Sequence, residues 1–289
     1  MKILDSHIHI FDANIIDSVI SRRELVRRLF LQEEGIFNRL DTGSLLDDMK
    51  DANVQAALLL PTSDVGNLLK TNRNCIQLAN DILELFTAGT LHPDYDNIAQ
   101  ELSFLNRSGV RVIKFCSFSQ GFALDHSNTR QMFQEIQTFN QNSEKPFSVV
   151  LDTLTLADQY FGSDPKHTTT PRALRELAVN FSGINFIGAH MGGLGAPFEE
   201  LKKDLKPLPN LYLDTSNASH TLSPDQFVTM LHTHGPGHII FGTDWPWFIP
   251  KGEIELVQEY MERAGFKEQE MEQVFSGNLE KILGVTNKR

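Results

Sequence analysis

Short hydrophobic runs recur along the chain, and segments of helical periodicity separate most of them. Short runs rich in Val, Ile and Leu are typical of strands buried in a parallel sheet. They cover residues 2–10, 54–60, 86–91, 110–116, 147–152, 184–190, 211–214 and 238–244. Helices are expected at 65–83, 96–106, 129–140, 171–180, 198–203 and 224–232. Eight strands alternating with helices predict an α/β fold, a distorted (β/α)8 TIM barrel.

The remaining segments add helices to this barrel. Residues 17–40 predict a basic helical insertion after the first strand, and residues 251–283 predict C-terminal helices on either side of Gly265. An open doubly wound sheet is the alternative fold. It has little support, because no G-x-G-x-x-G follows the first strand. No linker or repeat divides the chain, so residues 1–289 are expected to form a single domain.

The first strand carries the sequence Asp5-Ser6-His7-Ile8-His9. Alternation along a strand would place Asp5, His7 and His9 on one face, and Leu4, Ile8 and Ile10 on the other. Two histidines on one face can bind a metal ion if other elements bring further ligands. They can equally lie on a solvated edge strand, so this motif alone leaves both interpretations open.

Polar residues also stand at the ends of later predicted strands, where TIM barrels carry their catalytic groups. These residues are Lys114 and Cys116, Asp152, His190 and Asp244. Histidines and carboxylates gathered at one barrel mouth suit Zn²⁺ or a similar divalent ion. Asp244 is expected to bind the ion or to accept a proton from water. Cys116 is expected to pack in the core or to line the pocket, since no base beside it would make it a nucleophile.

Composition narrows the class of protein. The chain has 37 acidic and 26 basic residues and a formal net charge of −11, which argues against nucleic-acid binding. Its two cysteines have no metal-type spacing, and no run of apolar residues is long enough to span a membrane. We therefore expect a cytoplasmic protein that does not bind membranes.

These motifs together resemble the amidohydrolase superfamily, in the amidohydrolase-related branch that includes aminocarboxymuconate-semialdehyde decarboxylase. The resemblance rests on residues 5–9, 109–115, 190–193 and 241–246, and on Gly277-Asn278-Leu279. It implies a TIM barrel in which His7, His9 and Asp244 bind a divalent metal, usually zinc, with manganese possible. It also implies that His190 is a metal ligand or an acid/base, and it is compatible with a homodimer.

One position departs from the family pattern. Members with a full site have a histidine at the end of strand five, where this chain has Asp152. Either Asp152 supplies a carboxylate to the metal, or it accepts hydrogen bonds at the barrel mouth. His167, in the following loop, is a further candidate ligand, although an exposed loop histidine is the commoner case.

Several residues are candidates for binding an anionic small-molecule substrate. Arg23 and Arg27 lie four residues apart on one predicted helix face, Lys114 points into the barrel, and Trp245 follows Asp244. The leading hypothesis is a metal-dependent hydrolase of a small amide, lactone or ester. The second is a metal-dependent non-oxidative decarboxylase of an aromatic or enoic acid. The third is a metal-free hydrolase or a non-catalytic binding protein.

Overall fold

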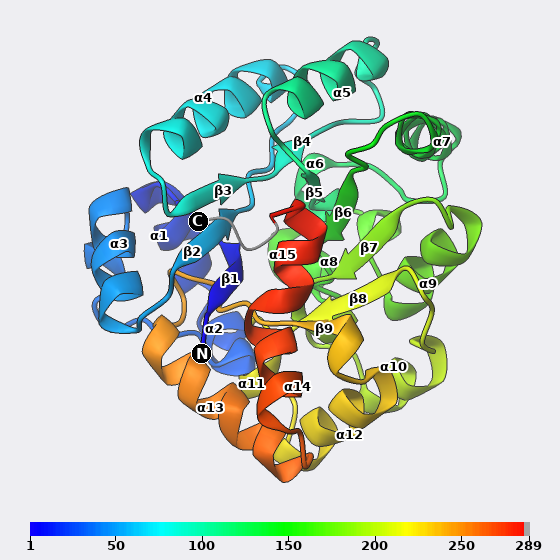
Figure 1. Cartoon of the computed structure of the whole chain (residues 1–289). Helices are drawn as coiled ribbons and strands as arrows, with labels where there is room; N and C mark the ends of the chain where they lie inside the picture. Colours follow the sequence, from blue (N-terminus) through cyan, green and yellow to red (C-terminus); the bar gives the residue numbers. More distant parts are fainter. Residues whose placement is uncertain (286–289) are drawn as a thin grey trace.

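The computed structural model describes residues 1–285, and its strands form a ring of parallel pairs (Figure 1). Their order follows the sequence, in one sheet of β1-β2-β3 and another of β4 to β9. The strands are β1 (Leu4–Ile8), β2 (Ala56–Leu59), β3 (Leu85–Thr87), β4 (Gly89–Thr90), β5 (Val112–Phe115), β6 (Ser148–Leu151), β7 (Asn185–Gly188), β8 (Leu211–Asp214) and β9 (Ile239–Ile240). All eight predicted strands are present, the third of them interrupted at Ala88 between β3 and β4.

Backbone hydrogen bonds close the ring between its last and first strands. The Ser6 N–H donates to the Phe241 carbonyl at 3.0 Å, and the Asp244 N–H donates to the His7 carbonyl at 2.9 Å. This closure leaves little room, because a Cβ atom on Gly242 would lie 2.8 Å from Ser6 Oγ and 2.9 Å from His7 Cβ. The predicted (β/α)8 barrel is therefore confirmed.

Helices surround the ring of strands (Figure 1). The α-helices are α1 (Ala13–Ile20), α2 (Arg23–Leu29), α3 (Thr42–Asp51), α4 (Leu68–Asp81), α5 (Ile98–Arg107), α6 (Ser117–Gln120), α7 (Ser127–Gln141), α8 (Ala157–Phe161), α9 (Pro171–Asn180), α10 (Phe198–Asp204), α11 (Ala218–Thr221), α12 (Pro224–His234), α13 (Pro250–Arg263), α14 (Glu268–Glu272) and α15 (Asn278–Leu283). Short 3₁₀ turns lie at Ile36–Asn38, Pro165–His167, His190–Gly192 and Pro236–His238, and a π-turn at Gln273–Gly277 joins α14 to α15. Among residues 1–285, no helix is long and apolar enough to cross a membrane.

Local sequence signals explain where some helices begin. Helix α9 starts at a proline, and the side chain of Thr170 accepts the Ala173 N–H at 3.2 Å. Helix α12 starts with a capping box between Ser223 and Gln226. Proline in the first turn and a hydroxyl at the N-cap both favour helix initiation, and so both helices begin where predicted.

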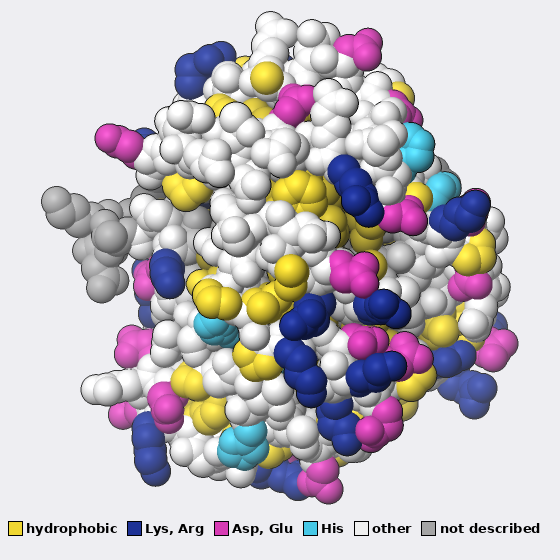
Figure 2. All heavy atoms as spheres, turned by 90° about the vertical axis from the view of Figure 1, so that its right-hand side faces the viewer, with side chains coloured by type: hydrophobic (Ala, Val, Ile, Leu, Met, Phe, Trp, Pro, Cys, Tyr) yellow, Lys and Arg dark blue, Asp and Glu magenta, His cyan; other side chains and the backbone are white. Residues whose placement is uncertain are grey.

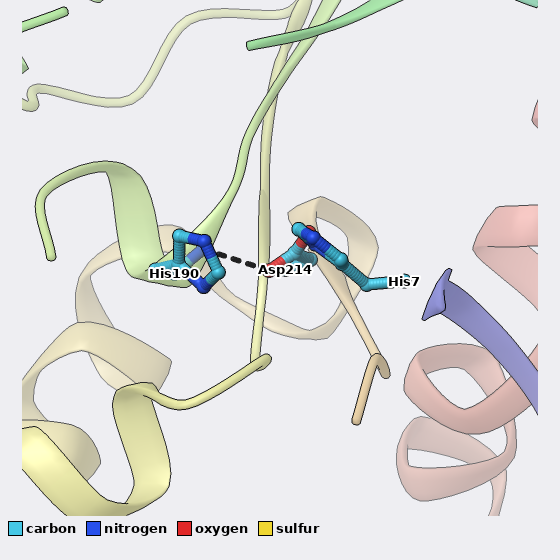
Figure 3. A group of neighbouring side chains, drawn as sticks. All are labelled: His7, His190 and Asp214. Carbon is cyan, nitrogen blue, oxygen red and sulfur yellow. Dashed lines mark hydrogen bonds and ion pairs between the residues drawn. The ribbon is translucent and has the colours of Figure 1, made fainter. Parts of the chain in front are cut away.

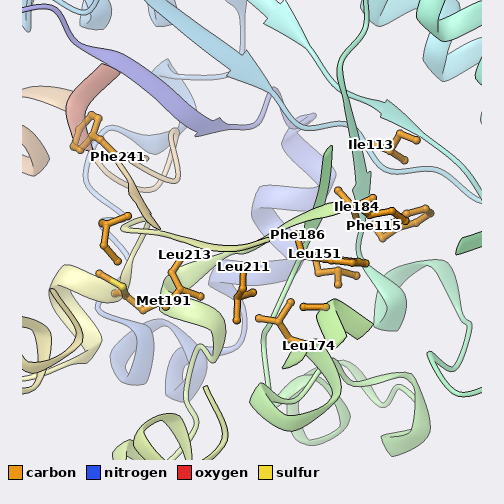
Figure 4. Close-up of a cluster of buried hydrophobic side chains, with 14 of the residues drawn as sticks. Ile113, Phe115, Leu151, Leu174, Ile184, Phe186, Met191, Leu211, Leu213 and Phe241 are labelled. Atoms are coloured by element: carbon orange, nitrogen blue, oxygen red, sulfur yellow. The ribbon is translucent and has the colours of Figure 1, made fainter. Parts of the chain in front are cut away.

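Two hydrophobic layers hold the barrel together. The outer layer packs strands against helices, and Figure 4 shows part of it around Phe115, Leu151, Phe186 and Leu213. The inner layer includes Leu4, Val112, Val150 and Tyr212, together with Leu279, Ile282 and Leu283 of α15. A Lys2–Glu280 ion pair of 2.5 Å also ties α15 to the residues before β1. Helix α15 therefore closes the amino-terminal end of the barrel, and the carboxyl ends of the strands are left for the site.

The first strand differs from simple alternation. Leu4 packs in the inner layer, whereas Ile8 packs in the outer layer. The expectation that Leu4 and Ile8 share a face is therefore wrong. The pairing of β1 with β2 shifts register between Asp5 and Ile8, and such an irregularity re-aims the side chains beyond it.

The surface carries charges of both signs. On the face shown in Figure 2, Lys and Arg side chains are intermingled with Asp and Glu. The net charge of −11 is thus not gathered there into a patch of one sign.

Candidate metal and substrate site

The polar residues at the carboxyl ends of the strands converge at one end of the barrel. The site contains His7 in β1, His9 just after β1, Asp152 after β6, His190 after β7, Asp214 at the end of β8 and Asp244 after β9. Figure 3 shows His7 and His190 on either side of Asp214. Six residues from five separate segments of the chain thus meet because parallel strands end at the same edge.

Three of these residues form a triangle of possible ligand atoms. His7 Nε2 lies 3.0 Å from His9 Nε2, and Asp244 Oδ1 lies 3.7 Å from each of these nitrogens. A tetrahedral ion with bonds of about 2.0–2.1 Å separates its ligands by roughly 3.4 Å. The observed spacing brackets that value, and so the triangle fits a divalent ion with open positions for other ligands.

The hydrogen bonds of the two histidines fix which nitrogens carry protons. His7 Nδ1 lies 2.8 Å from the carboxylate of Asp214, and His9 Nδ1 lies 3.1 Å from the Leu60 carbonyl. Both oxygens can only accept, since Asp214 is ionised at neutral pH, and so both Nδ1 atoms carry hydrogen. In neutral rings the two Nε2 atoms then face each other as lone pairs. A cation between them would remove this repulsion.

The pKa values of the two histidines favour neutral rings, the form that binds a metal ion. Burial lowers the pKa of His7 to about 4 and that of His9 well below its usual value. Burial also raises the pKa of Asp244 to about 7, because nothing in the chain fully offsets its buried charge. Zinc and manganese bind neutral imidazoles together with a carboxylate, and a bound cation would balance the buried charge of Asp244.

Asp214 connects the triangle to His190 and is not among the site residues predicted from the sequence. Its Oδ2 accepts from His7 Nδ1, and its Oδ1 accepts the His190 backbone N–H at 2.8 Å and the Ser216 hydroxyl. His7 lowers the pKa of this buried carboxyl to about 2, against the effect of burial. The available signal was its position, since Asp214 ends a predicted strand as Asp152 and Asp244 do.

His190 is held as a charged acid on the other side of the site. Its Nδ1 donates to the Ser216 carbonyl at 3.0 Å, and its Nε2 lies 3.8 Å from Asp152 Oδ2. Burial opposes a charged ring, but the carboxylates of Asp152, Asp244 and Asp214 outweigh it and raise the pKa of His190 to about 9. The proton on Nε2 is therefore the one available to a substrate.

Asp152 lies with cations instead of in the triangle. Its Oδ2 is 3.9 Å from Lys114 Nζ as well as 3.8 Å from His190 Nε2. Burial would raise its pKa, but His190 and Lys114 outweigh burial and hold the pKa well below its usual value. Lys114 is 1% exposed, and its Nζ has no hydrogen-bond partner among residues 1–285. In this structure Asp152 thus lies between two cationic groups at the barrel mouth.

The backbone is strained where the site residues leave their strands. His190 has a φ of 55° and Asp244 a φ of 66°, both in the left-handed region that non-glycine residues avoid. Hydrogen bonds from their N–H groups, to Asp214 Oδ1 at 2.8 Å and to the His7 carbonyl at 2.9 Å, hold these conformations. Such strain is often kept at functional sites.

Two cavities adjoin His190. The first, of about 120 Å³, is bounded by His9, Asp152, His190, Asn217 and Asp244 and by an apolar wall that includes Phe11, Phe161 and Trp247. The second, of about 170 Å³, lies among Arg28, His190, Thr221 and the Gly193–Gly195 turn. The site therefore combines charged groups with an aromatic wall and an arginine, all suited to a small ligand.

Other residues singled out in the sequence lie away from the two cavities, with the exception of Trp247. Arg23 and Arg27 are exposed and border neither cavity, and Arg23 pairs with Glu33.

Trp245 is fully buried in the outer layer and donates from Nε1 to Asp48 at 2.9 Å, whereas Trp247 reaches the first cavity. His167, the further candidate ligand, lies in its 3₁₀ turn and borders neither cavity. Cys116 is buried and borders neither cavity, so it packs in the core.

Several solved structures share this architecture. They include an uncharacterised TIM-barrel protein from Bordetella bronchiseptica (15% identity, TM-score 0.73, 98% of this chain and 99% of that one). A 5-carboxyvanillate decarboxylase from Novosphingobium aromaticivorans, complexed with manganese and 4-hydroxy-3-methoxy-5-nitrobenzoic acid, has 16% identity and a TM-score of 0.70 (98% and 96%). A probable 2-pyrone-4,6-dicarboxylic acid hydrolase from Acinetobacter baumannii has 16% identity and a TM-score of 0.61 (98% and 100%). At such low identities these similarities show the fold.

A comparison of the sequence with protein families, and not the structural similarity, shows the family of this chain. No curated protein sequence matches the chain. The family profile described as amidohydrolase matches residues 126–285, more than half of the chain, and includes His190, Asp214 and Asp244. The family predicted from the motifs is therefore confirmed: this chain belongs to the amidohydrolase family.

Proposed function

We propose that the chain is a metal-dependent hydrolase of a small carbonyl compound, an amide, lactone or ester, that carries an anionic group. The main support for this proposal is the geometry of His7 and His9, whose Nε2 atoms lie 3.0 Å apart. Both nitrogens face inward as acceptors beside Asp244. His7, His9 and Asp244 would hold the ion, zinc by preference. When bound, it supplies Lewis acidity, which polarises a carbonyl and makes water more acidic.

Two side chains at the triangle carry out the proton transfers of hydrolysis, one as the base and the other as the acid. Asp244 accepts a proton from the attacking water on a carboxylate oxygen. His190, charged at neutral pH, donates from Nε2 to the oxygen or leaving group of the substrate. Asp152 keeps His190 charged, and the Ser216 carbonyl orients its ring through Nδ1, 3.0 Å away.

Charge and shape support an anionic substrate of limited size. Arg28 has no ion pair among the described residues, borders the second cavity with His190, and is placed to receive an anion there. The apolar wall of the first cavity excludes water from the reacting groups.

A second function, non-oxidative decarboxylation of a small aromatic acid, is favoured by one observation. The wall formed by Phe11, Phe161 and Trp247 offers aromatic surface beside the charged groups. In this reaction His190 would protonate the ring carbon that loses carbon dioxide. The similar structure of a decarboxylase supports this candidate.

Isotope labelling of products separates the two functions. The zinc- and manganese-supplemented protein is incubated with a panel of small amides, lactones, esters and aromatic acids. Hydrolysis in ¹⁸O-water places one heavy oxygen in the acid product, whereas decarboxylation in deuterium oxide places deuterium on carbon. Asp244→Asn serves as the inactive control. Turnover of none of these compounds, with either metal, would contradict both functions.

A further inference from the structure

Asn217 is a buried amide without a hydrogen-bond partner. Its side chain is fully buried, and neither Oδ1 nor Nδ2 has a partner among residues 1–285. The residue borders the first cavity with His9, His190 and Asp244. Leaving both halves of a buried amide unpaired is unfavourable, and such groups are rare in folded proteins. A ligand in the cavity is the available source of partners.

The fold alone does not account for this side chain. Asn217 stands at the N-cap of α11, where asparagine ordinarily accepts a backbone N–H, yet it makes no such bond. Its backbone carbonyl receives the His220 N–H at 3.0 Å, so the turn is held without the amide. With a φ of 55°, the position would suit glycine better.

We propose that Asn217 recognises the substrate, through a planar group that presents a hydrogen-bond acceptor and a donor side by side. The Nδ2 hydrogens donate to the acceptor, and Oδ1 accepts from the donor. A carboxamide or lactam offers this pair. An ester or lactone offers acceptors only and leaves Oδ1 unpaired. The inference rests on the proposed function and narrows it, since it selects amides from among the carbonyl compounds.

Two ring compounds that differ by one atom group test this selection. 2-Pyrrolidinone carries an N–H where γ-butyrolactone carries an oxygen. Ligand-detected NMR titration of the purified protein should show the lactam binding about tenfold or more tightly than the lactone, because a site built for a donor rejects the analogue lacking it. Asn217→Gly should reduce this preference to about twofold or less, since it removes both amide atoms.

Matched variants separate recognition from folding. Asn53 has a φ of 56° and is exposed, so Asn53→Gly makes the same chemical change in the same backbone region and should keep the preference. Asn217→Asp keeps size but loses the Nδ2 donors, and should weaken lactam binding by about tenfold. Thermal unfolding of each variant checks that it is folded.

Three outcomes would overturn the inference: equal binding of lactam and lactone, binding of neither, or a lactam preference that survives Asn217→Gly. These binding results do not depend on turnover. A preference that Asn217→Gly abolishes, in a protein that hydrolyses nothing, would refute the proposed function alone. Hydrolysis without that preference would refute the role of Asn217 alone.

Discussion

At the scale of single residues, the site is organised by what the histidines donate to. The Asp214 carboxylate accepts the Nδ1 hydrogen of His7, and the Leu60 carbonyl accepts that of His9. Both Nε2 lone pairs therefore face into the triangle that the two rings form with Asp244. Sequence spacing predicted that His7 and His9 meet, but it cannot give a tautomer. That depends on acceptors from β2 and β8, which only the folded barrel brings near.

The first prediction concerns Asp214. Asp214→Asn removes the carboxylate that orients His7, and we expect metal affinity to fall by about 10–100-fold, as for other partners of metal-bound histidines. Competition with a chromophoric chelator measures the affinity. Asp164→Asn, a change at an exposed carboxylate outside the site, is the control. Unchanged affinity in Asp214→Asn would show that the tautomer of His7 is fixed in another way.

At the scale of elements, the phase of α2 decides which arginine reaches the site. Arg23 and Arg27 are the substrate-binding arginines predicted from the sequence, because they share a helix face. The helical segment is interrupted at Ser21 and Arg22, and α2 begins at Arg23. Leu25, Val26 and Leu29 form the buried face of α2. Arg28 thereby borders the cavity beside His190. A helix face can be read from periodicity, but the neighbour it meets cannot.

The second prediction follows from this phase. Arg28→Ala should raise KM for an anionic substrate about three- to tenfold, because it removes one partly solvated charge contact. Arg27→Ala should change KM by less than about twofold, since exposed charges away from a site contribute little. Steady-state kinetics on the substrate found in the panel measures both. The reverse ranking would restore the arginine pair selected from sequence.

The third prediction concerns the closure of β9 on β1. Gly242→Ala forces a Cβ atom within 2.9 Å of His7 Cβ. We expect the free energy of unfolding to fall by about 1–3 kcal/mol, as in other overpacked sites. Metal content should fall with it. Gly252→Ala, where nothing lies within 4 Å of the new Cβ, is the matched control. Equal stability of the two variants, measured by urea denaturation, would contradict the tight closure.

At the scale of the whole molecule, the barrel was predictable because its signals repeat. Eight apolar runs gave the strands, and polar residues at their ends gave His190 and Asp244. The break at Ala88, the irregularity in β1 and the role of Asn217 were not predictable. Each depends on contacts between strands, or on a missing contact, that the order of residues does not record. The family match supports the overall architecture and leaves the substrate to experiment.

The fourth prediction is a dependence of stability on pH, through His234. Burial lowers the pKa of this histidine to about 4. The unfolded chain, with an ordinary pKa of about 6.5, therefore binds its proton first, and stability is lost as pH falls from about 6.5 towards 4. At pH 5 the loss from this residue is about 2 kcal/mol.

Urea denaturation of wild type and His234→Phe at pH 7 and pH 5 measures that contribution. The variant lacks the titrating group, so its free energy of unfolding should fall less between the two pH values. Equal falls in both proteins would show that His234 does not contribute. Metal-free samples treated with chelator keep metal release out of the comparison.

The central claim is that His7, His9 and Asp244 bind one divalent ion, and metal analysis of the purified protein tests it most directly. Plasma mass spectrometry should find one equivalent of zinc or manganese in wild type and in His167→Ala, whose histidine lies outside the cavities. His7→Ala and Asp244→Asn should contain almost none. Wild-type protein that takes up no added zinc or manganese, or full occupancy in both site variants, would contradict the claim.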